Sequence, residues 1–133
     1  MELGVQSARS RAGHPPALLR DHAGITSLGA TGLPLGLFSH TTQSAAACHL
    51  TPGSALLVVS RGIVEASAVE TECADTEFGL DAVRQSLQQA MALSARDLCL
   101  AALQATQRFT LTAPTHNDLT ALALVRNTSH DVV

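Results

Sequence analysis

The chain has 133 residues, of which 46% are hydrophobic and 14% charged, and its formal net charge is −3. This length and composition predict one globular domain, or part of one, and exclude an intrinsically disordered chain. Eight basic residues against eleven acidic ones, with three Phe and neither Trp nor Tyr, give no basic patch and no aromatic platform for nucleic acid.

The sequence predicts a cytoplasmic protein with no membrane partner. No apolar run approaches the roughly 20 residues of a membrane-spanning helix. Residues 1–4 lack the basic segment that opens a signal peptide. Cys48, Cys73 and Cys99 are widely spaced and form no CxxC pair, so we expect free, buried thiols in a reducing compartment.

The first half of the chain predicts mainly strands. Gly24 supplies the positive φ that a first hairpin turn needs, and Pro52-Gly53 is a turn dipeptide between a second pair of strands. Residues 56–59 are continuously apolar, which is typical of a strand covered on both faces. The expected strands are 5–12, 17–20, 25–28, 44–50 and 54–60, with a Gly- and Pro-rich loop over 29–38.

The second half predicts two helices and a last strand. Over residues 77–93 the apolar positions recur at three- and four-residue steps, as in an amphipathic helix. Ser94, with Asp97 three residues later, looks like a variant capping box that opens a second helix. A strand is expected over 119–125 and a disordered tail over 127–133. The expected buried face of the second helix is Leu98, Ala101, Ala102, Ala105 and Phe109.

Six short motifs follow one another in order. They are Ala12-Gly13-His14-Pro15-Pro16, Pro34-Leu35-Gly36-Leu37, Pro52-Gly53, Ser60-Arg61-Gly62-Ile63-Val64-Glu65-Ala66, Phe78-Gly79 and Asn117-Asp118-Leu119-Thr120. In order and spacing they resemble the C-terminal half of a PPM-type (PP2C-like) serine/threonine phosphatase domain of the SpoIIE/RsbU-like group. The resemblance implies an α+β fold over residues 1–126: a partial αββα sandwich of antiparallel sheets with two packed helices.

The resemblance also implies a metal-dependent phosphatase. In this family a pair of Mn²⁺ or Mg²⁺ ions activates a bridging water for attack on the phosphoester. Two of the metal ligands are the Asp of a Ser/Thr-Asp-Gly motif and the first Asp of an Asp-Asp-x-Thr motif, and here those positions hold Arg61 and Asn117. Other ligands lie in upstream Gly-Asp and Asp-x-x-Gly-His-Gly segments, neither of which occurs in this sequence.

Asn117 and Asp118 therefore mark a degraded metal region, in which Arg61 replaces the other ligand. An arginine carries only hydrogen-bond donors, and Asn117 has a single neutral carbonyl oxygen to offer. Asp118 keeps a carboxylate, at a position next to the principal ligand of the family. We expect no catalytic residue in this chain and no binding of the two ions by the chain alone.

Other polar residues have two interpretations each. His14 could act as a base, but its place before two prolines favours a turn residue. Cys48 and His49 could join His116 in a soft metal site, although alternation along a strand would put the first two on opposite faces. Arg61 either binds phosphate on an inactive site or occupies a position without functional constraint.

Four functions are left open by the sequence. The chain is a divergent or truncated phosphatase without autonomous hydrolysis, or a noncatalytic module that binds a regulatory phosphoprotein of the anti-sigma antagonist type. It is otherwise one half of a split domain, completed by a chain that carries the missing segments, or an unrelated small α/β binding protein. Because a partial sheet exposes unpaired strand edges, we also expect self-association.

Overall fold

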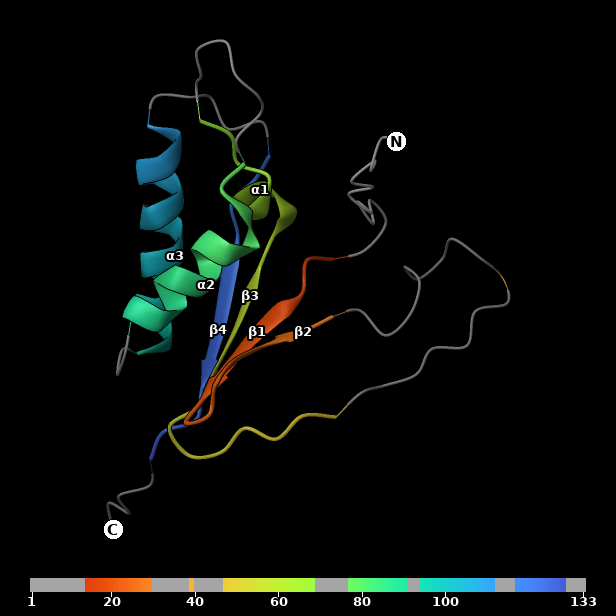
Figure 1. Cartoon of the computed structure of the whole chain (residues 1–133), viewed down its shortest axis with the longest axis vertical. Helices are drawn as coiled ribbons and strands as arrows, with labels where there is room; N and C mark the ends of the chain where they lie inside the picture. Colours follow the sequence, from red (N-terminus) through yellow and green to blue (C-terminus); the bar gives the residue numbers. More distant parts are fainter. Residues whose placement is uncertain are drawn as a thin grey trace, which may run out of the picture.

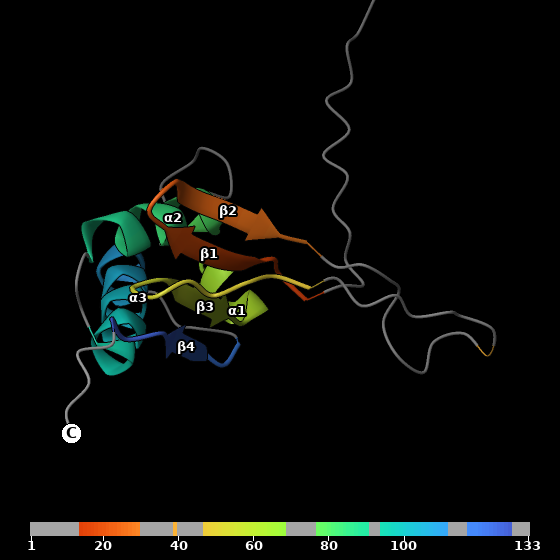
Figure 2. The same cartoon turned by 90° about the horizontal axis from the view of Figure 1, so that it is seen from below.

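The computed structural model describes residues 14–29, 39, 47–68, 77–90, 94–111 and 117–128. Their fold is α+β, with one antiparallel sheet and two long helices packed on one of its faces (Figure 1). The strands lie in the order β2-β1-β3-β4 (Figure 2). The elements are β1 (Ala17–Asp21), β2 (Gly24–Leu28), β3 (Ala55–Val59), α1 (Arg61–Val64), α2 (Gly79–Gln89), α3 (Ala95–Thr110) and β4 (Ala121–Val125). The predicted α+β class is confirmed.

The hairpin of β1 and β2 forms as the sequence predicts. Ala17 pairs with Leu28 at the open end and Asp21 with Gly24 at the turn. Gly24 has a φ of +129°, a conformation that L side chains rarely adopt. The Asp21 carboxylate accepts the Ala23 N–H at 2.8 Å, which fixes the turn from within.

The predicted pairing of residues 44–50 with β3 is wrong for the part that the structure describes. Residues 47–50 form no strand, and both edges of β3 are already paired, with β1 on one side and β4 on the other. The Pro52-Gly53 turn does form, but the Gly53 N–H donates to the Arg126 carbonyl at 2.7 Å. The turn therefore leads the chain alongside β4 instead of closing a hairpin.

Helix α2 is shorter than the predicted 77–93. It ends at Gln89, because Ala90 leaves the helical region with a ψ of 47°. Arg20 on β1 donates from Nη1 to the carbonyls of Leu87 and Ala90, at 2.7 and 2.9 Å. A cation at the C-terminal end of a helix satisfies its unpaired carbonyls and opposes the negative end of its dipole. This long-range cap fixes the end of α2 against the sheet.

Helix α3 begins with the predicted cap. The Asp97 N–H donates to Ser94 Oγ at 3.2 Å, and Ser94 Oγ donates to the Asp97 carboxylate at 2.8 Å. Leu98 is buried as expected, but Phe109 is only half-buried, and Thr106 faces the core instead. Thr106 is accommodated there because its hydroxyl donates to the Ala102 carbonyl at 2.8 Å.

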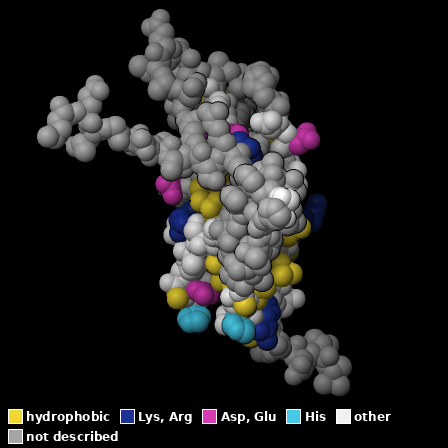
Figure 3. Space-filling view, turned by 90° about the vertical axis from the view of Figure 1, so that its right-hand side faces the viewer, with side chains coloured by type: hydrophobic (Ala, Val, Ile, Leu, Met, Phe, Trp, Pro, Cys, Tyr) yellow, Lys and Arg dark blue, Asp and Glu magenta, His cyan; other side chains and the backbone are white. Residues whose placement is uncertain are grey.

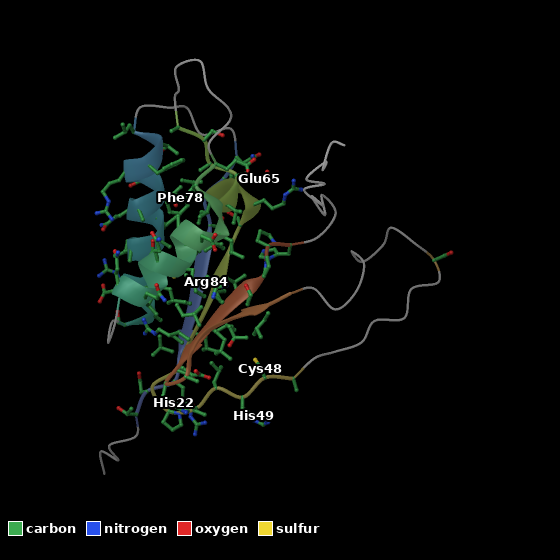
Figure 4. All side chains as sticks on the ribbon, in the orientation of Figure 1. His22, Cys48, His49, Glu65, Phe78 and Arg84 are labelled. Atoms are coloured by element: carbon green, nitrogen blue, oxygen red, sulfur yellow. The ribbon has the colours of Figure 1, made fainter. Side chains whose placement is uncertain are left out.

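The core lies between the helices and one face of the sheet. Its larger members are Leu18, Leu57, Val59, Ile63, Val83, Leu87 and Leu98, with Ala55 and Ala102 between them. At its edge the rings of Phe78, labelled in Figure 4, and Phe109 lie with their centroids 5.5 Å apart and their planes inclined by 56°, and they join the beginning of α2 to α3. Arg84 on α2 donates to the Ile25 carbonyl at 3.0 Å, which ties the same helix to β2.

The other face of the sheet carries aliphatic side chains. Leu19, Leu56 and Leu124 lie side by side across β1, β3 and β4, and Val58 lies opposite Leu122. We call these five residues the apolar sheet face. Leu122 and Leu124 are 59% and 51% exposed, and Figure 3 shows hydrophobic side chains along this side of the molecule. The expectation that residues 56–59 are covered on both faces is therefore only half met, since Leu56 and Val58 are half-buried.

The expected burial of the cysteines can be tested for two of the three, and several other expected segments lie outside the described residues. Cys48 is exposed and Cys99 half-buried, so the expected burial of the thiols is wrong for Cys48, while Cys73 lies outside the described residues. The strand expected over 5–12, nearly all of the loop over 29–38 and most of the tail also lie outside. Among the described helices, none has the length and apolar character needed to cross a membrane.

Candidate functional site at the end of β3

The structure brings together the two motifs in which the resemblance places metal ligands. Ser60-Arg61-Gly62 follows β3 directly, and residues 117–120 lead into β4. Because the two strands are antiparallel, with Val59 opposite Ala121, the end of β3 meets the beginning of β4. We call this place the motif junction. The upper end of Figure 1, where α1 lies beside β3, shows its position.

Ser60 connects the two motifs through its backbone and its hydroxyl. Its N–H donates to the Thr120 carbonyl at 2.9 Å. Its Oγ donates to the Asp118 carbonyl at 3.0 Å and accepts the Thr120 N–H at 3.0 Å. One hydroxyl thereby satisfies a donor and an acceptor of the opposite segment, a role that the sequence alone does not reveal.

The surroundings of Gly62 leave no room for a side chain at this position of the motif. The residue is buried, and a Cβ built on it would collide with the Asp118 carbonyl oxygen and lie 3.1 Å from the Asn117 Cβ. The segment before β4 can therefore pass directly over the first turn of α1 only because residue 62 has no side chain. The neighbouring Ile63 is fully buried and anchors α1 in the core.

Arg61, at the beginning of α1, forms an ion pair with Glu65, the residue that follows the helix. Its Nε and Nη2 donate to the same carboxylate oxygen of Glu65, at 3.2 and 2.8 Å. The two side chains are 47% and 38% exposed, so the pair contributes little to stability. Glu65, labelled in Figure 4, is thus paired with the arginine at a position where the resemblance places a metal ligand.

The donors at the motif junction do not fit a pair of divalent cations. Asn117 and Asp118 are both exposed, and the carbonyl of Asp118 already accepts the Ser60 hydroxyl. Mn²⁺ and Mg²⁺ require several charged oxygens, whereas this place offers a fixed guanidinium, a neutral amide and the carboxylates of Asp118 and Glu65. The described residues contain no group of three or more His, Cys, Asp or Glu side chains that could hold a metal ion. The metal roles of Asn117 and Asp118 stay predictions.

The other candidates lie away from this junction. His14 is exposed, and its Nδ1 lies 2.9 Å from the carbonyl of the adjacent Pro15. Cys48 and His49 are exposed on a segment without strand structure, so the argument from strand alternation does not apply to them. His116 lies outside the described residues.

The fold is similar to solved bacterial phosphatase domains. The SiaA-PP2C domain of Pseudomonas aeruginosa gives a TM-score of 0.69 at 14% sequence identity, over 85% of this chain and 44% of that one. The PP2C phosphatase domain of SpoIIE from Bacillus subtilis, solved with a fragment of its regulatory domain, gives 0.68 at 14% identity, over 89% and 33%. The same phosphatase domain in a crystal form without domain swapping gives 0.56 at 18% identity, over 90% and 50%. This chain thus spans a third to a half of each solved chain.

Sequence comparison establishes the family. No curated protein sequence matches the chain significantly. The sequence model of stage II sporulation protein E (SpoIIE) matches residues 6–127, which include all six motifs and most of the 133 residues. The chain therefore belongs to the SpoIIE family of PPM-type phosphatase domains.

Proposed function

We propose that this chain is a divergent SpoIIE-type phosphatase region that lacks metal-dependent hydrolysis on its own. One observation carries the proposal: Arg61 lies between Ser60 and Gly62, the two residues that meet Asn117 and Asp118, and the resemblance places carboxylate ligands at positions 61 and 117. The guanidinium is charged at any physiological pH and presents donors only. It would repel a cation where the family's Asp would bind one.

The charge at the motif junction supports this proposal. Among the described residues of the motif junction, Arg61 contributes one positive charge, and Glu65 and Asp118 contribute two negative charges, which leaves a net charge of −1. Two divalent ions would bring four positive charges to this place. With Glu65 already paired to Arg61, Asp118 is the one other residue that the structure describes at this place with a carboxylate to offset them.

Titration of the purified chain with MnCl₂ in a calorimeter tests the proposal, together with hydrolysis of a phosphoserine peptide in the same buffer. We expect neither stoichiometric uptake of Mn²⁺ nor Mn²⁺-dependent release of phosphate. Uptake of two ions per chain with turnover by the chain alone would contradict the proposal.

A double variant makes the electrostatic argument specific. Arg61→Asp with Asn117→Asp would add two carboxylates to those of Glu65 and Asp118 at the motif junction, and we expect it to gain measurable Mn²⁺ binding. Arg96→Asp with Gln85→Asp is the matched control, because it changes the net charge equally at two exposed helix positions. Equal Mn²⁺ binding by both double variants would show that the motif junction is not a degraded metal site.

A second candidate function is favoured by the apolar sheet face. The chain spans only 33% to 50% of the solved phosphatase chains, and Leu122 and Leu124 are largely exposed. We propose that this face packs against a second sheet, supplied by a polypeptide segment that carries the Gly-Asp and Asp-x-x-Gly-His-Gly motifs. Sheets packed face to face lie about 10 Å apart, so the aliphatic side chains of both would interdigitate.

Affinity purification from the native cell, with mass spectrometry of the associated proteins, tests this candidate. We expect a polypeptide with both motifs to co-purify and to be lost with the Leu122→Ser, Leu124→Ser double variant. Co-purification of a protein without these motifs would contradict it.

Binding of a cytoplasmic regulatory phosphoprotein through Arg61 stays a further prediction. Glu65 already occupies two N–H groups of that guanidinium, and a phosphate would have to displace it.

A further inference from the structure

Leu111, the residue that follows α3, combines two unfavourable features. Its side chain is 80% exposed, more than that of any other large hydrophobic residue that the structure describes. Its backbone has a φ of +51° and a ψ of −111°, a conformation that costs a side-chain-bearing residue free energy and that glycine adopts readily. No other non-glycine residue in the described ranges has a positive φ. Since glycine is the usual residue where a helix ends with positive φ, the helix end does not account for a leucine here.

Leu111 continues a row of residues along the outer side of α3. Leu100, Gln104, Gln107 and Leu111 follow one another at steps of four, three and four residues, which places them along one side of the helix, and all four are exposed. In Figures 1 and 2, α3 lies at the margin of the molecule, with the sheet on its other side. A shallow hollow of about 560 Å³ is lined by Gln104, Gln107, Arg108 and Leu111. We call these four residues and Leu100 the α3 outer face.

The α3 outer face is positively charged. Arg108 is exposed and forms no hydrogen bond or ion pair with any residue in the described part of the chain. Arg96, one turn before Leu100, is likewise exposed and without such a partner among the described residues. The acidic residue of the helix, Asp97, is engaged in the cap with Ser94. Arg108 opposes the negative end of the helix dipole, but that role requires no leucines beside it.

We propose that the α3 outer face binds an acidic amphipathic helix of a partner protein, with apolar residues on Leu100 and Leu111 and a carboxylate on Arg108. The two leucines lie about 16 Å apart along the helix axis, a distance that three turns of a partner helix span. Gln104 and Gln107, between them, can each donate and accept hydrogen bonds.

Charge selects this occupant over two others. The chain has a net charge of −3, but the α3 outer face carries only positive charge, so a second copy seated there would bring Arg108 against a face of like charge. An anionic membrane is disfavoured because this face has two leucines and no aromatic residue to enter the lipid interface.

The test is an NMR titration of the 15N-labelled full chain with a synthetic helical peptide of about 15 residues. The peptide carries leucines at i, i+4, i+7 and i+11 and glutamates on both flanks of this row, and a control peptide has lysine in place of every glutamate. We expect saturable shifts of the Gln104, Arg108 and Leu111 amide signals with the acidic peptide, weaker binding at high salt, and no saturable shifts with the lysine peptide.

Three results would overturn the proposal. They are equal binding of the two peptides, absence of saturable shifts at these amides, and binding of the chain to phosphatidylglycerol vesicles without binding to the acidic peptide.

Leu111→Gly separates a binding role from a structural one. Glycine adopts the positive φ without steric cost, so the variant should keep or raise the unfolding midpoint in urea. It should also weaken binding of the acidic peptide about tenfold or more, because an apolar contact is lost. A lower midpoint with unchanged affinity would show that Leu111 serves the fold alone and would overturn the proposal.

Arg108→Gln tests the charged contact. It removes the guanidinium and should weaken binding of the acidic peptide several-fold. Asn127→Asp is the matched control, because it lowers the net charge equally at an exposed position beyond the end of β4, and it should leave the affinity unchanged. Equal affinities of the two variants would overturn the assignment of the carboxylate to Arg108.

Discussion

Gly62 lies directly against the Asp118 carbonyl group and the Asn117 Cβ, and Ser60 joins the same segment through three hydrogen bonds. These two residues determine the shape of the motif junction. Arg61, between them, determines its charge. The chain thus has the small and hydroxyl-bearing residues that bring the two motifs together, while Arg61 has no oxygen to offer a hard cation and Asn117 has a neutral carbonyl oxygen in place of a carboxylate.

Substitution of Gly62 tests the shape of this junction. Gly62→Ala adds a Cβ that would collide with the Asp118 carbonyl, so either α1 or the segment before β4 must move. We expect a loss of about 1–3 kcal/mol in the free energy of unfolding, as for other overpacked sites. Urea unfolding followed by circular dichroism measures it, because the chain has no Trp or Tyr for fluorescence.

Gly29→Ala is the matched control, since a Cβ at this position meets nothing within 4 Å and the residue has no positive φ. Equal unfolding midpoints for the two variants would show that residue 62 tolerates a side chain and that the two motifs do not lie as close as described.

The sequence could predict part of this site. Motif order alone identified Arg61 and Asn117 as positions of interest, and the structure places their two segments together. The roles of Ser60 and Gly62 could not be predicted, because both depend on which strand pairs with β3. A serine and a glycine often follow a strand, and their roles here depend on the segment over residues 117–120 that lies against them.

At the scale of elements, local signals were reliable and long-range pairing was not. The turn at Gly24 and the cap at Ser94 are satisfied by residues within a few positions, and both formed as predicted. The strand expected over 44–50 does not form in its described part, residues 47–50, because the edges of β3 are paired with β1 and β4, which are distant in sequence. Arg20 similarly caps α2 from 67 residues away, which periodicity cannot indicate.

Ser94 offers a direct test of the local cap. Ser94→Ala removes the acceptor of the Asp97 N–H and should lower the free energy of unfolding by about 1 kcal/mol. Ser94→Asn retains a side-chain acceptor at the N-cap and should stay close to the parent chain. The unfolding midpoint in urea compares the three chains, and an Ala variant as stable as the parent would mean that the cap contributes nothing to α3.

At the scale of the whole molecule, the described chain covers one face of its sheet with helices and leaves aliphatic residues on the other. The helix-covered face holds the core, in which Leu18 and Leu57 are almost fully buried. On the opposite face Leu122 and Leu124 remain about half exposed. The sequence pattern of residues 56–59 already indicated two covered faces, and the exposure of their neighbours on β4 shows where a second layer would lie.

This imbalance predicts self-association of the isolated chain. Burial of an aliphatic surface lowers the free energy, so this face will pair with a copy of itself when no second sheet is available. We expect a concentration-dependent oligomer in sedimentation velocity at micromolar concentrations, and a clear shift toward monomer for the Leu122→Ser, Leu124→Ser double variant. Leu111→Ser is the control, because Leu111 is 80% exposed but lies at the end of α3, away from the apolar sheet face. Weaker self-association of the double variant, with unchanged self-association of the Leu111 variant, would assign the contact to the apolar sheet face. A parent chain that stays monomeric throughout this range would mean that Leu122 and Leu124 need no partner.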